Sequence, residues 1–127
     1  MNEEEKRVLI DKYLQAYNTF DIEGMLAAVT TDIEFRNMAQ GEVNAQATGK
    51  EDLRRLAEQS KGLFSSRKQT LTRFAEHDDR ATINVDFEGI LAVDLPNGMK
   101  KGATLKISGR TDFRFKEGKI REIIDVS

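Results

Sequence analysis

The sequence predicts an α+β domain in which N-terminal helices pack on a strongly curved antiparallel sheet, giving a cone-shaped roll. Hydrophobic residues recur at helical spacing in the first half of the chain and alternate at strand spacing in the second half. The change occurs once, near residue 65, and this order of elements is typical of the α+β class. The 127 residues fit one domain, 1–127, without a repeat or a linker.

Three helices are expected in the first half. The first covers residues 3 to about 19, where an apolar stripe follows three glutamates that suit the positive end of a helix dipole. Asp21 can cap a short second helix that runs through Val29. Thr48 and Glu51 have the spacing of a capping box and predict the start of a third helix.

One strand is expected among these helices. Ile33, Phe35 and Asn37 alternate with polar residues and share a face, which we expect to look inward. Residues 39–49 are polar and are predicted to form a loop.

The second half reads as a meander of long strands. We expect strands over 67–76, 81–95, 105–115 and 119–127, joined by turns at Asp78-Asp79, Pro96-Asn97-Gly98 and Glu117-Gly118. Gly89 interrupts the alternation and predicts a β-bulge that would help to curl the sheet. A curved sheet with a helix across its mouth encloses an interior, so the pattern predicts a ligand-sized pocket.

Composition excludes several classes of function. The 20 basic and 22 acidic residues give a net charge of −2, and no basic cluster suggests nucleic-acid or membrane binding. The chain has no cysteine, which excludes disulfides and thiolate chemistry, and its one histidine, His77, cannot form a multi-histidine metal site. His77 is expected at a solvated hairpin tip.

Neither a signal peptide nor a membrane-spanning run is evident, so we expect a cytoplasmic protein. We expect no metal or organic cofactor.

The order helix, short helix, strand, helix and long bent sheet resembles the nuclear transport factor two-like superfamily. Within it, the chain is similar to the SnoaL-like polyketide cyclase and ketosteroid isomerase groups. The resemblance covers nearly the whole chain and is carried by three segments, Tyr13–Gly24, Asp32–Asn37 and Phe113–Glu122. It implies a homodimer formed through the outer face of the sheet.

The resemblance also implies roles for particular residues. The isomerases place an oxyanion-stabilising tyrosine on the first helix, and Tyr13 matches it. Their base and their second, acidic donor are matched by Asn37 and Thr111, neither of which is a carboxylic acid. The cyclases carry their basic aspartate on the last strand after a Gly-Lys-Ile-x-Glu run, which leads here to Asp125.

Each of these residues has a second interpretation. Asp125 is our candidate general base, but it could equally be exposed or pair with Arg110 or Arg121. Tyr13 could stabilise an oxyanion or only pack in the core, and Asn37 could contact a ligand or make a structural hydrogen bond. We assign ligand contacts also to Tyr17, Thr111 and Phe113, for which core packing is the alternative.

Two functions remain open from the sequence. The first is a cofactor-independent cyclase or isomerase that removes a proton next to the carbonyl of a small hydrophobic or aromatic compound. The second is a non-catalytic module that binds a hydrophobic ligand or acts as a dimeric scaffold. An accessory protein with a filled core is a third possibility, which an internal cavity would argue against.

Overall fold

A computed structural model describes residues 1–127 and contains three helices and six strands. In chain order they are α1 (Glu3–Asn18), α2 (Ile22–Ala27), β1 (Val29–Ala39), β2 (Glu42–Thr48), α3 (Lys50–Lys61), β3 (Phe64–His77), β4 (Arg80–Leu91), β5 (Thr104–Lys116) and β6 (Lys119–Val126).

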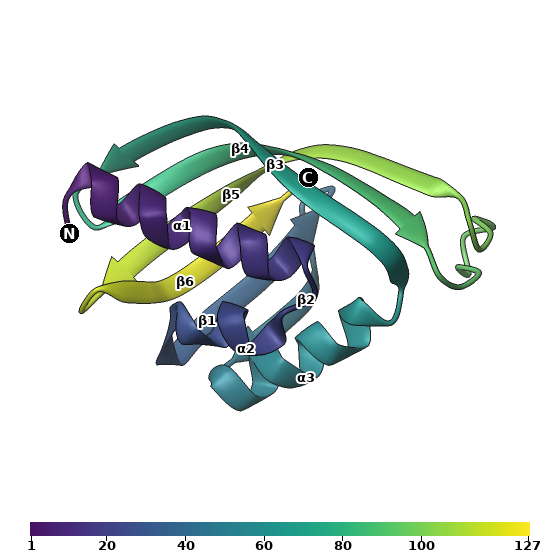
Figure 1. Ribbon diagram of the computed structural model, residues 1–127, viewed down its shortest axis with the longest axis horizontal. Helices are drawn as coiled ribbons and strands as arrows, with labels where there is room; N and C mark the ends of the chain where they lie inside the picture. The colour runs from purple at the N-terminus through teal and green to yellow at the C-terminus, as the bar shows by residue number, and fades with distance from the viewer.

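The strands form one curved, open sheet with the helices on its concave side, which confirms the predicted α+β class (Figure 1). The strand order is β2-β1-β6-β5-β4-β3. All neighbouring pairs are antiparallel except β1 and β6, which run parallel. The alternation of side chains could not reveal this pair, because a period of two is the same for either strand direction.

Helix α1 lies across the concave face and is fixed to β3 near both of its ends. At its C-terminal end, the Asn18 side chain donates to the backbone oxygen of Gln69 (3.1 Å) and accepts from the backbone nitrogen of Gln69 (2.7 Å). Near its N-terminus, the buried Lys6 binds the carboxylate of Glu76 and the backbone oxygen of Asp78. These contacts hold the buried face of α1 over the interior of the sheet.

Local signals place α2 and α3, with an error in each. Asp21 caps α2 as predicted, with its carboxylate accepting from the backbone nitrogen of Gly24 at 2.9 Å, although α2 ends at Ala27. The predicted capping box of α3 is wrong. Thr48 is the last residue of β2, and the carboxylate of Asp52 accepts from its backbone nitrogen at 2.9 Å.

The polar segment 39–49, predicted as a loop, contains strand β2. It pairs antiparallel with β1 and forms one edge of the sheet. Edge strands tolerate polar and exposed side chains, which removes the alternation that identifies a half-buried strand. Only Ala47 in β2 is buried.

The bulge predicted at Gly89 is not present. The register between β4 and β5 is continuous through this residue, and the register shifts of this part of the sheet lie in β3. A Cβ at position 89 would stand 2.7 Å from the ring of Phe64. Gly89 therefore makes room for a close aromatic contact. Strand β4 also ends at Leu91 instead of reaching Leu95, while the turn predicted at 96–98 is present.

The core lies between the helices and the concave face of the sheet. Its most buried side chains are Ile10, Ile33, Ile83, Ile120 and Ile123, at 0% exposure. His77 ends β3 with a fully solvated side chain, as predicted. None of the helices combines the length and the apolar character that a bilayer-crossing segment requires.

Gly109 in β5 is expected to be required for the position of the end of β6. A Cβ at position 109 would lie 2.7 Å from the backbone oxygen of Val126, which cannot swing away as a side chain can. We expect Gly109→Ala to lower the free energy of unfolding by about 1–3 kcal/mol, measured by urea denaturation. Gly62→Ala is the control, because its φ is −70° and the nearest atom to the new Cβ is 3.7 Å away. Equal stability of the two variants would contradict this explanation.

Candidate functional site

The candidate residues Asn37, Asp125 and Thr111 form one row across three neighbouring strands. Asn37 of β1 is the register partner of Asp125 of β6, and Asp125 is also the register partner of Thr111 of β5. Side chains at paired positions point to the same face of a sheet. The pairing therefore places an amide, a carboxylate and a hydroxyl side by side on the concave face.

Asp125 is a half-buried carboxylate that no basic residue neutralises. The hydroxyl of Thr111 donates to its Oδ1 at 2.7 Å. Burial raises the pKa of Asp125 to about 6, and the hydrogen bond from Thr111 opposes this rise. The two arginines considered as ion-pair partners bind other acids: Arg110 pairs with Asp112, and Arg121 pairs with Asp32 and Glu34.

Tyr13 reaches the row from helix α1. Its side chain is buried, and burial raises its pKa above the ordinary value, with the Asp125 carboxylate raising it further. The phenol therefore stays protonated at neutral pH and keeps a hydrogen to donate. Tyr17 lies one turn later on α1, and burial is also the main cause that raises its pKa.

Asn37 makes a side-chain contact that the sequence did not suggest. Its Nδ2 donates to Oδ1 of Asn44 on β2 at 2.7 Å. This bond uses one of the two N–H groups of the Asn37 amide and leaves the other available. Asn44 was missed because it lies in the segment that was predicted to be a loop.

These side chains surround one cavity of about 470 Å³ between the sheet, α1 and α3. Tyr13, Tyr17, Asn37 and Asp125 all line it, together with apolar side chains that include Phe35, Leu53 and Leu56. A smaller hollow of about 220 Å³ adjoins it, shares Tyr17, Asn37 and Asp125, and contains Thr111. The interior is therefore not filled by side chains.

Phe113 does not line either hollow, which argues against the predicted ligand contact. Its ring is 2% exposed and packs edge-on against Tyr13, with 6.3 Å between ring centroids. It belongs to the next row of the sheet, where its register partners are Ile123 and Ala81, both buried. Phe113 supports Tyr13 from the core side.

Arg67 on β3 is the residue that sequence analysis missed. It lines the cavity and is 5% exposed, although arginine is rarely so buried. Its guanidinium carbon lies 3.7 Å from the ring centroid of Tyr17 and 4.6 Å from that of Phe20. The weak alternation of this strand gave no sign that position 67 faces inward.

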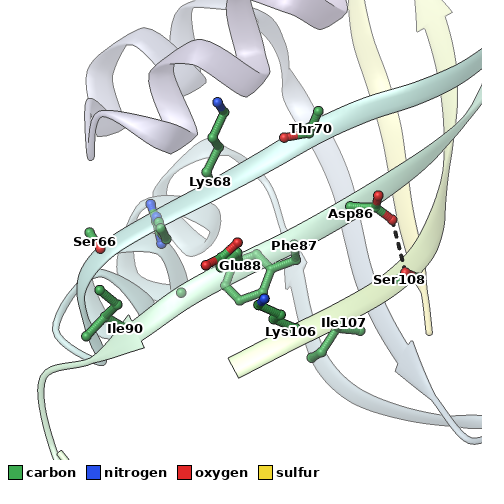
Figure 2. A pocket seen from close by; sticks show the side chains of 12 residues that line it. Ser66, Lys68, Thr70, Asp86, Phe87, Glu88, Ile90, Lys106, Ile107 and Ser108 are labelled. Atoms are coloured by element: carbon green, nitrogen blue, oxygen red, sulfur yellow. Dashed lines mark hydrogen bonds between the residues drawn. The ribbon is translucent and has the colours of Figure 1, made fainter. Parts of the chain in front are cut away.

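A third hollow lies on the opposite, outer face of β3, β4 and β5 (Figure 2). Its volume is about 530 Å³, and its rim carries charges of both signs, among them Lys68, Glu88 and Lys106. In this hollow, the hydroxyl of Ser108 donates to Oδ1 of Asp86 at 3.0 Å (Figure 2). Neither Tyr13 nor Asp125 lines this hollow.

Nowhere in the structure do three or more His, Cys, Asp or Glu side chains gather as a metal site would require.

Comparison with solved structures finds the same fold at low sequence identity. A candidate polyketide cyclase from Xanthomonas campestris pv. campestris superposes with a TM-score of 0.84 at 18% identity, covering 100% of this chain and 93% of that one. AclR, a candidate hydroxylase from Streptomyces galilaeus, gives 0.79 at 18% identity, covering 98% and 90%. TerC, co-crystallised with polyporic acid, gives 0.76 at 16% identity, covering 95% and 89%.

Comparison with curated proteins found no significant match. The SnoaL-like domain family matches residues 10–123, which include the second half of α1, Asn37 and Thr111, and which end within β6, before Asp125. The match spans nearly the whole chain and agrees with the order of elements that suggested this resemblance. The chain is therefore a member of the SnoaL-like domain family, with the curved α+β fold of nuclear transport factor two-like proteins.

Proposed function

We propose that the cavity binds a small hydrophobic or aromatic carbonyl compound and that Asp125 removes a proton from the carbon next to the carbonyl. One observation carries the proposal: a carboxylate with a raised pKa lines the cavity together with a buried, protonated tyrosine. A base whose pKa lies near the working pH is both ionised and strong enough to accept a proton. The TerC complex with polyporic acid supports a small-molecule cavity in this fold.

The proposed chemistry uses three side chains. Thr111 occupies Oδ1 of Asp125, so Oδ2 is the oxygen that accepts the proton. The electron pair of the broken C–H bond moves to the carbonyl oxygen, where Tyr13 and the second N–H of Asn37 donate to the enolate. Protonated Asp125 then returns the proton at a second carbon, which is an isomerisation. In a cyclisation, the enolate carbon instead attacks a second carbonyl, and the oxygen of that carbonyl takes the proton from Asp125.

A non-catalytic ligand-binding module is the alternative. It is favoured by Asn37 and Thr111, which stand where the isomerases carry carboxylic acids. In that case the cavity would bind the same class of compound without proton transfer. Measuring binding and proton exchange on the same variants separates the two functions.

Asp125→Asn is expected to abolish proton exchange while keeping ligand binding. The probe is 2-tetralone, an enolisable aromatic ketone, and the measurement is deuterium incorporation next to its carbonyl by NMR. We expect the rate to fall by about 10²–10⁴-fold, because asparagine cannot accept the proton. Asp112→Asn on the outer face is the matched control and should keep the wild-type rate. If wild-type protein binds 2-tetralone without accelerating exchange, the non-catalytic alternative holds.

The exchange rate is expected to depend on pH through Asp125. Below its pKa of about 6 the carboxyl is protonated and cannot act as a base, so the rate should rise with pH through this value and then level off. Thr111→Val removes a hydrogen bond that lowers this pKa, so the rising limb should move upward by about one pH unit. Thr111→Ser keeps the hydroxyl and should leave the limb in place. If the pH at which the rate rises is the same in both variants and in wild type, the base is a group other than Asp125.

We also propose that two copies of the chain pair through the outer face of the sheet. Ile124 and Val126 of β6 and Met38 of β1 point outward, because they alternate with the inward Asp125 and Asn37. Around this apolar patch, ion pairs join Glu122 to Arg36 and Arg114. An apolar centre with a charged rim is typical of a protein interface.

Light scattering after size-exclusion chromatography tests this pairing. Wild-type protein should have about twice the mass of the 14.4 kDa chain. Ile124→Glu should yield the monomer, because it places a charge in the centre of the patch. Val8→Glu on the exposed face of helix α1, on the opposite side of the sheet, is the control and should remain dimeric. A monomeric wild-type protein would rule out the proposal.

A further inference from the structure

Arg67 is a buried cation that no acid of the protein neutralises. The chain buries two cationic side chains, Lys6 at 3% and Arg67 at 5% exposure. Lys6 is paired with the carboxylate of Glu76. No carboxylate oxygen lies within 4.0 Å of a nitrogen of Arg67, the distance that defines the ion pairs of this structure. A buried charge without a partner is costly, so its presence calls for an explanation.

The contacts of Arg67 orient its guanidinium without supplying negative charge. Its Nε donates to the backbone oxygen of Tyr17 at 3.0 Å, and Nη1 donates to the hydroxyl of Ser60 at 3.4 Å. The rings of Tyr17 and Phe20 pack against the planar group. The remaining nitrogen, Nη2, is buried and has no hydrogen-bond partner. The side chain is therefore fixed in place with donor capacity left over.

Arg67, which carries this guanidinium, is one of the residues that line the cavity with Asp125. Both side chains line the 470 Å³ cavity, but they come from β3 and β6, which are separated by β4 and β5. Three strand spacings amount to about 14 Å along the sheet, and the curvature shortens the distance across the cavity. The cation and the base would therefore meet different parts of one ligand.

We propose that the ligand of this cavity is an aromatic organic anion, and that Arg67 binds its carboxylate or phenolate oxygen while Asp125 faces another part of the molecule. This inference rests on the proposed function and names the substrate class. The planar guanidinium suits such oxygens, because Nη2 and the second N–H of Nη1 remain free to donate to them. The apolar side chains Phe35, Leu53 and Leu56 of the same wall suit an aromatic body.

A pair of probes with the same rings tests the charge requirement. The probes are 2-naphthoate and the neutral 2-naphthamide, and the measurement is the dissociation constant by isothermal titration calorimetry at pH 7.5. We expect wild-type protein to bind the carboxylate at least about tenfold more tightly than the amide. Equal affinities for the two probes would overturn the proposal.

Variants of Arg67 test whether this residue produces the preference. Arg67→Gln should reduce the preference to less than about twofold, and Arg67→Lys should keep part of it, because it retains the charge but loses the planar fork. Arg73→Gln, an exposed residue on the same strand, should bind both probes like wild type. A preference that survives Arg67→Gln would overturn the assignment. Binding of the amide by Arg67→Gln serves as the check on its folding.

A measurement on unaltered protein keeps the test valid if Arg67→Gln does not fold. Titration with 2-naphthoate should shift the Nε–Hε NMR signal of Arg67, and titration with 2-naphthamide should leave it in place. A signal that responds equally to both would refute the proposal. The two proposals fail separately: Asp125→Asn should keep the preference for the carboxylate, even if proton exchange is never observed.

Discussion

The cross-strand alignment of Asn37, Asp125 and Thr111 is the constraint on which the rest of the site depends. Because side chains alternate along a strand, a slip of one residue in β6 would replace Asp125 by Ile124 in the cavity. Register shifts flank the row, at Asn37/Met38 between β1 and β2 and at Arg114/Phe115 between β5 and β6. The same irregularities that bend the sheet thus also select which residues face the interior.

The electrostatics of the cavity depend on the separation of the Asp125 carboxylate from the Arg67 guanidinium. Asp125 receives a hydroxyl from Thr111, and Arg67 rests against aromatic rings and neutral oxygens. Were the two side chains paired, the pKa of Asp125 would fall and its carboxylate would become a weaker base. The separation leaves one group able to accept a proton and the other able to attract an anion. Burial raises the pKa of both Asp125 and Tyr13.

The fold and the chemistry of this protein rest on different observations. Structures of the same shape include a candidate cyclase and a candidate hydroxylase, so the curved sheet by itself selects no reaction. What distinguishes this chain is a small set of side chains on that frame. Tyr13, Asn37, Thr111 and Asp125 line its two adjoining hollows, and Arg67 adds a buried charge to the same wall.

Local periodicity predicted the helices, the long strands and the inward direction of Asn37, because these depend on neighbours along the chain. The place of Asp125 was expected only from the family resemblance. Tertiary structure alone decided the parallel pairing of β1 and β6, the strand β2 at the sheet edge and the burial of Arg67. It also moved Phe113 from the predicted ligand site into the core and gave Gly89 a packing role in place of a bulge. Each of these features arises from contacts between distant segments, and spacing within one segment cannot encode which partner will cover it.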